Sequence, residues 1–229
     1  SDVRRYFQLF EADLHALKAR SEDIKLHHEK LLDRLRPGES LLSADAFFIS
    51  GKAYMLGVHV TPGDTKNGYT YVKEIGTESA VNSTEAIGAM LIDLKSKGFH
   101  PKIVEYDRAK GVVVSDAHLK EVHQVEVVHV STHASYAENR IKFLKQRIRA
   151  RLSSLVYPVT GNLLTEIVIG CTHIVNKVAR KSNNGRSSYN AHHGLNQNYK
   201  DHYAFSPANY VEVHVESDNN VTHYRRVSA

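Results

Sequence analysis

Three acidic residues occupy positions from which their carboxylates could act together. Asp45 interrupts an apolar stretch, Asp107 follows the predicted strand 102–106, and Glu138 lies early in a long amphipathic segment. A carboxylate within an apolar strand is costly unless it is exposed at an edge, paired or bound to a cation. Hard divalent ions such as Mg²⁺ prefer oxygen ligands, and two such ions can serve phosphodiester chemistry. Because the chain has 25 acidic residues, placement alone also fits a purely structural role for these three.

A line of cations follows Glu138 at helical spacing. Lys142, Lys145 and Arg149 come four, seven and eleven residues later, so we expect them on the same helix face. Arg140 adds charge around the same helix, and a phosphate backbone could lie along this surface. A solvated helix face with modest ion pairs is the alternative interpretation of the same pattern.

The hydrophobic pattern predicts an α/β fold in which three antiparallel strands precede alternating helices and strands. Expected strands cover 41–49, 53–60, 68–75, 102–106 and 125–130, with a hairpin turn at 50–52. Expected helices cover 3–35, 83–97, 115–122, 135–155 and 161–181, the second of them capped by Ser83 or Thr84. A polar loop at 182–194 and a C-terminal hairpin complete the prediction. Asp107 then ends a central strand, where α/β sheets usually present functional side chains.

Composition narrows the class of protein. The 229 residues are 41% hydrophobic, enough for one α/β domain with additional helices, and no apolar run is long enough for a membrane span. Cys171 is the only cysteine, which excludes an internal disulfide and favours an intracellular setting. The net charge of +5 favours an anionic partner. We interpret most of the 15 histidines as packing or surface residues.

Three segments resemble those of retroviral and retrotransposon integrase-like proteins, which belong to the DDE transposase superfamily. The first is 45–48 (DAFF) with 51–56 (GKAYML), the second is 97–99 (KGF) with 103–107 (IVEYD), and the third is 133–142 (HASYAENRIK) with its basic helix. The resemblance implies a ribonuclease-H-like catalytic core with a mixed five-stranded sheet. It implies that Asp45, Asp107 and Glu138 are catalytic ligands of Mg²⁺ or Mn²⁺, two ions being expected when substrate is bound.

The resemblance also implies DNA as the partner, both element ends and target, in a homo-oligomeric and nuclear assembly. His133 would then contact phosphate or pack near the site. We expect a helical lead-in at 1–38, the catalytic core at 39–156, a helix and polar loop at 157–200, and a β-hairpin at 201–229. Two alternatives stay open: an inactive, domesticated DNA-binding or assembly protein, and a ribonuclease-H-like nuclease that hydrolyses strands without joining them.

Overall fold

The computed structural model describes residues 29–76, 79–107, 115–130, 135–178, 185–195, 210–215 and 223–228. At 64–67, 107, 135 and the last two ranges it describes the backbone alone. Residues 29–33 are helical, and the part of the predicted lead-in before them lies outside the described residues. No helix of the described ranges is long and apolar enough to cross a membrane.

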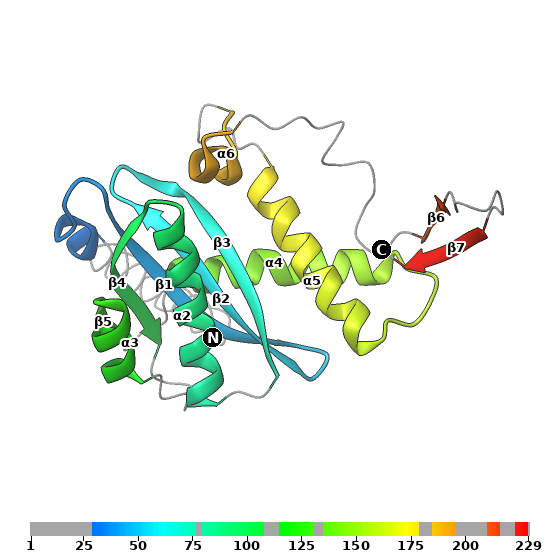
Figure 1. Ribbon diagram of the computed structural model, residues 1–229, viewed down its shortest axis with the longest axis horizontal. Coiled ribbons are helices and arrows are strands. Elements are labelled where there is room, and N and C mark those ends of the chain that lie inside the picture. The colour runs from blue at the N-terminus through cyan, green and yellow to red at the C-terminus, as the bar shows by residue number, and fades with distance from the viewer. Residues whose placement is uncertain are drawn as a thin grey trace, which may run out of the picture.

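A mixed five-stranded sheet forms the centre of the molecule (Figure 1), with the strand order β3-β2-β1-β4-β5. The strands are β1 (Glu39–Ile49), β2 (Lys52–Thr61), β3 (Asp64–Gly76), β4 (His100–Asp107) and β5 (Glu126–Val130). The first three strands pair antiparallel, whereas β4 pairs parallel to both β1 and β5. This topology confirms the predicted α/β, ribonuclease-H-like sheet.

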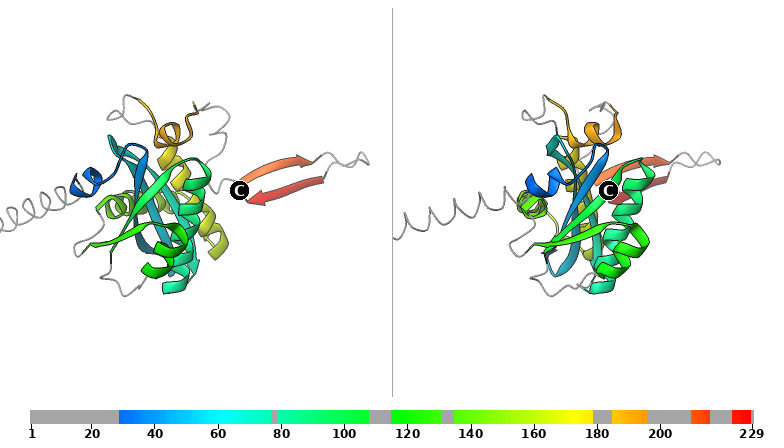
Figure 2. Two further views of the ribbon diagram at one scale, coloured as in Figure 1. Left: turned by 60° about the vertical axis from the view of Figure 1, so that its left-hand side comes forward. Right: turned by 90° about the vertical axis from the view of Figure 1, so that its left-hand side faces the viewer.

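Helices cover both faces of this sheet (Figure 2). They are α2 (Ala80–Ser96), α3 (Asp116–His123), α4 (Ser135–Ser153), α5 (Gly161–Lys177) and α6 (Ser188–His193). Residues of α2 and α3 share one hydrophobic cluster with the sheet, and residues of α4 and α5 share the other. A separate two-stranded antiparallel sheet, β6 (Tyr210–Val215) with β7 (His223–Ser228), agrees with the predicted C-terminal hairpin.

The central strand β1 shows how the two clusters are kept apart. Successive side chains of a strand point to opposite faces, so Leu41 and Phe47 pack towards α4 and α5 while Leu42 and Ala44 pack towards α2. Residues 40–47 are all buried, as expected for a strand covered on both faces. The parity of a residue in β1 therefore decides which helices it meets.

Turn chemistry sets the register of β1 against β2. Ser50 and Gly51 form a two-residue connection with φ values of 48° and 82°, the positive values that a type I′ hairpin requires. Ile49 consequently pairs with Lys52, and the register continues back to Asp45 opposite Leu56. The predicted hairpin is confirmed at this position.

Two predicted boundaries are wrong. Helix α2 begins at Ala80, where the side chain of Ser79 accepts a hydrogen bond from the Asn82 backbone N–H, so Ser83 and Thr84 lie inside the helix. The predicted polar loop contains α6, which the Ser187 side chain caps by accepting from Asn190 N–H. Helix α6 packs on β3 and α5, so part of this segment belongs to the folded core.

Candidate active site

Asp45 lies inside the protein on the face of the sheet that α4 and α5 cover. Only 2% of the residue is exposed. Asp45 lies on the same face of β1 as Ser43 and Phe47. Its partner in β2, Leu56, belongs to the same hydrophobic cluster as Phe47. A buried carboxylate needs hydrogen bonds or nearby positive charge, because burying an unpaired ion costs on the order of several kcal/mol.

Asp107 is the last residue of β4, beside Asp45 in the backbone. The parallel register pairs Ser43 of β1 with Glu105 of β4 and Ala44 with Tyr106, and Asp45 and Asp107 are the next residues of the two strands. Asp107 also pairs with Val130 of β5. The two aspartates therefore each follow a paired residue of two neighbouring central strands.

The first turn of α4 lies close to the same end of β4. Tyr136, two residues before Glu138, has a phenol whose pKa is raised by burial and then by the nearby Glu105 carboxylate. Glu105 precedes Asp107 by two residues and has the same parity in β4. The start of α4, in the turn that carries Glu138, therefore lies within electrostatic range of the Glu105 carboxylate.

Glu138 is exposed, and the predicted line of cations lies on the same face of α4. Lys142 and Arg149 are exposed, while Lys145 is partly buried with its Nζ 5.9 Å from the centre of the Phe47 ring. That contact joins the cationic line to β1, two residues beyond Asp45. The structure thus has Asp45 and the backbone of Asp107 on neighbouring strands, and it packs α4, the helix that bears Glu138, against β1.

Arg140 differs from the other cations that were predicted to meet DNA. It is only 8% exposed, and its Nη2 donates a hydrogen bond to the Gly68 carbonyl at 3.1 Å. The helical spacing explains this, because Arg140 follows the buried Ala137 by three residues and precedes the buried Leu144 by four. Arg140 packs inside the protein, so we leave it out of the DNA-contact set. His133 lies outside the described residues.

Glu105 is an additional buried carboxyl group that sequence reasoning did not select. It is 0% exposed and pairs with Ser43 of β1 and Val128 of β5. The alternating positions 103, 105 and 107 of β4 were the signal that could have identified it. Glu105 thus adds a buried carboxylate on the face of the sheet that Ser43 and Asp45 share.

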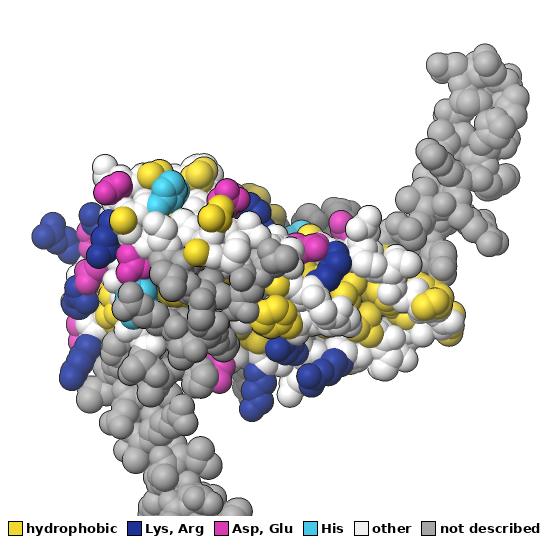
Figure 3. All heavy atoms as spheres, turned by 90° about the horizontal axis from the view of Figure 1, so that it is seen from below, with side chains coloured by type: hydrophobic (Ala, Val, Ile, Leu, Met, Phe, Trp, Pro, Cys, Tyr) yellow, Lys and Arg dark blue, Asp and Glu magenta, His cyan; other side chains and the backbone are white. Residues whose placement is uncertain are grey.

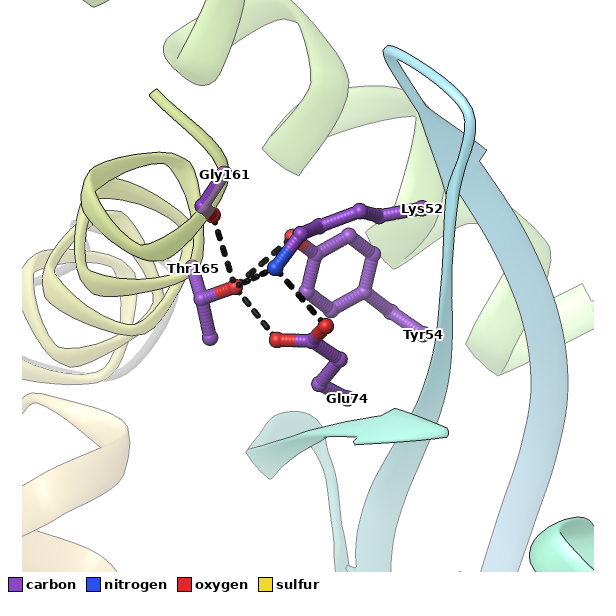
Figure 4. Close-up of polar contacts among 5 residues, drawn as sticks. All are labelled: Lys52, Tyr54, Glu74, Gly161 and Thr165. Carbon is purple, nitrogen blue, oxygen red and sulfur yellow. Dashed lines mark hydrogen bonds and ion pairs between the residues drawn. The ribbon is translucent and has the colours of Figure 1, made fainter. Parts of the chain in front are cut away.

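A polar network holds α5 against the antiparallel edge of the sheet (Figure 4). Lys52 Nζ donates to Glu74 Oε1 at 2.8 Å and to Thr165 Oγ1 at 3.0 Å, and Thr165 Oγ1 donates to Glu74 Oε2 at 2.5 Å. Tyr54, which is 0% exposed, has its hydroxyl 3.3 Å from Thr165 Oγ1. Burial raises the pKa of Tyr54. Lys52 and Tyr54 thus pack between the antiparallel edge of the sheet and α5.

The donor set suits a hard divalent ion, since Asp45, Asp107 and Glu138 offer only carboxylate oxygens. Among the side chains that the structure describes, no three His, Cys, Asp or Glu residues are grouped closely enough to hold a metal. The side chain of Asp107, one of the three predicted ligands, lies outside the described side chains.

Similarity to known proteins was found among solved structures. No family model and no curated protein matches the chain. A solved simian T-cell lymphotropic virus intasome, in complex with the PP2A regulatory subunit B56 gamma, is similar at 14% identity and a TM-score of 0.48, over 70% of this chain and 55% of that chain. The present chain thus spans little more than half of that protein.

Two structures of the HTLV-2 integrase catalytic core domain in complex with magnesium, one trimeric and one dimeric, are also similar. The identity is 16% in both, the TM-scores are 0.47 and 0.46, and the match covers 68% of this chain and 95% of each core. The assignment of the fold itself rests on the strand order and on the helices that cover both faces of the sheet.

Proposed function

We propose that this chain is a metal-dependent polynucleotidyl transferase of the integrase type, which cleaves and joins DNA strands. Asp45, Asp107 and Glu138 would be its metal ligands. The observation that carries the proposal is the β1–β4 register, in which Asp45 and Asp107 directly follow the paired residues Ala44 and Tyr106 in strands next to α4. The similarity of three sequence segments to integrase-like proteins adds the third acid, Glu138.

The chemistry of these residues supports the proposal. A set of carboxylate oxygens selects Mg²⁺ or Mn²⁺ over softer metals. When bound, two such ions supply stabilisation of the attacking and the leaving oxygens of a phosphodiester exchange. The role of the protein is to hold three carboxylates on rigid elements, two central strands and a long helix.

The cations of α4 would bind and orient the DNA. Lys142 and Arg149 are exposed on the helix face of Glu138, and Lys145 lies between them in sequence and against Phe47. Contacts to phosphates fix the position of a duplex without reading its sequence. A DNA strand bound along this line would be directed towards the carboxylates at the start of α4.

The test is the joining of a labelled DNA end to a target duplex in Mg²⁺ or Mn²⁺. Asp107→Asn removes one ligand charge with little change in size, so joining should be lost while DNA binding persists. Glu85→Gln is the matched control, because Glu85 is exposed on α2, which covers the opposite face of the sheet. Equal joining by wild type and Asp107→Asn would contradict the proposal.

The other outcomes identify the alternatives. Metal-dependent hydrolysis without joining would assign a nuclease, and salt-sensitive DNA binding without any cleavage would assign an inactive DNA-binding or assembly protein. We also propose that the active form is a homo-oligomer. Light scattering on the protein with and without DNA tests this, and a monomer in both states would contradict it.

A further inference from the structure

A second site of positive charge lies at the opposite end of the parallel strands from the candidate active site. It is a pocket of about 620 Å³ where the segment before β1 meets β4, β5 and the end of α3. The pocket is lined by Arg34, Leu35, Arg36, Glu39, Lys102, Ile103, Lys120, Gln124, Val125 and Glu126. Its volume is within the range of binding sites for ligands of moderate size.

Within the pocket, both acidic side chains are already engaged. Arg34 Nη2 donates to both carboxylate oxygens of Glu126 at 2.6 Å, and this pairing raises the pKa of Arg34. Glu39 Oε2 accepts a hydrogen bond of 2.9 Å from the backbone N–H of Arg36. Four cations and two carboxylates line the pocket, which leaves a formal excess of two positive charges.

Three cations of the pocket are left for a ligand. Arg36, Lys102 and Lys120 are exposed, and over the described ranges of the chain their side chains take part in no ion pair. They come from three separate segments, so the fold rather than the sequence gathers them. In Figure 3, Lys and Arg side chains gather at the end of the molecule that carries residues 29–33, β5 and α3.

The lining indicates which part of an anionic polymer would bind. Ile103 and Val125 are each only 3% exposed, and none of the lining residues is aromatic. Proteins that hold unpaired bases stack them on aromatic side chains, whereas contacts to the backbone of a duplex need only cations and polar groups. The chemistry of this pocket thus suits phosphodiester groups more than bases.

We propose that Arg36, Lys102 and Lys120 bind the phosphate backbone of a DNA duplex. The choice of nucleic acid as ligand rests on the proposed function. This site is distinct from the cationic line of α4. Glu39 precedes Asp45 by six residues of one strand, which at about 3.3 Å per residue separates the pocket from the carboxylates by about 20 Å. The protein would then contact DNA at two places.

The salt dependence of DNA binding tests this inference. Affinity for a short labelled duplex is measured in EDTA over a range of salt concentrations for wild type and for the triple variant Arg36→Gln, Lys102→Gln and Lys120→Gln. Three lost phosphate contacts should make the slope of log K against log salt shallower by about 2.7. Lys73→Gln is the single-charge control, because Lys73 is exposed on β3 at the other edge of the sheet, and it should leave the slope nearly unchanged.

Several results would overturn the inference. One is a triple variant that unfolds at the same urea concentration as wild type and keeps the wild-type slope. A triple variant that keeps the DNA binding of wild type but loses affinity for polyglutamate would assign the pocket to an acidic protein instead. Because EDTA prevents strand joining, neither measurement depends on the proposed metal centre. Joining that fails while the slope changes as expected would contradict the proposed function alone.

Discussion

The histidine cluster between β2, β3 and α6 gives a quantitative prediction for stability against pH. His59 is 4% exposed, and its ring centre lies 4.6 Å from that of Phe99 and 5.3 Å from that of His192. Burial, with the nearby charge of Lys97, lowers the pKa of His59 to about 4. The unfolded chain, with an ordinary histidine pKa of about 6.5, binds a proton that the folded protein excludes. Stability therefore falls as the pH drops from about 6.5 towards 4.

The size of this loss follows from the two pKa values. Between about pH 7.5 and about pH 5, linkage gives roughly 2 kcal/mol of lost unfolding free energy for His59 alone. His192, whose pKa burial and His59 lower to about 3, adds to the total fall. His59→Phe keeps an aromatic ring but cannot take up a proton. The variant should lose about 2 kcal/mol less than wild type over the same interval.

Urea unfolding at the two pH values measures this difference directly, since the comparison is between pH values and not between absolute stabilities. His100→Phe provides the control, because His100 is exposed at the start of β4. The control should lose as much stability as wild type. A His59→Phe variant that loses the same free energy as wild type would refute the reasoning.

Two further predictions concern the elements that carry the site. Thr165→Val removes the hydroxyl shared by Lys52, Tyr54 and Glu74, so we expect a loss of about 1 to 3 kcal/mol in urea unfolding. The pKa of Glu74, which Lys52 and then Thr165 lower, should rise when followed by NMR, and an unchanged value would contradict the network. Leu144→Ala leaves a cavity between α4 and the sheet, since Leu144 is 0% exposed, and should cost about 2 to 5 kcal/mol. A smaller loss than about 1 kcal/mol would argue against this packing.

Periodicity was sufficient to predict most of the sheet and the helices beside it. The stripe of Ile141, Leu144 and Ile148 correctly indicated the buried face of α4. The Ser50 and Gly51 turn was recognisable because few residues accept positive φ. The start of α2 was misplaced because Ser79, Ser83 and Thr84 are all suitable capping residues, and only hydrogen bonding distinguishes them.

Features built from distant segments were beyond local reasoning. Helix α6 has six residues and no hydrophobic period. Its position depends on His192, whose ring stacks on those of Tyr69 and Phe99 with ring centres 4.0 and 4.6 Å apart, respectively. The pocket of Arg36, Lys102 and Lys120 is likewise formed by the fold. The positions of Asp45 and Asp107 were predictable only as far as their strands were, because the register that pairs the preceding residues, Ala44 and Tyr106, comes from contacts across the sheet.

A crystal structure of the protein with Mn²⁺, its ions located by anomalous scattering, tests the central claim most directly. We predict that manganese binds between Asp45 and Asp107 with Glu138 beside it, and that this ion is lost in a crystal of the Asp107→Asn variant. Two ions with DNA present would be about 3.5 to 4 Å apart. Absence of manganese at these carboxylates when it is present in excess, or an ion held by other residues instead, would contradict the account.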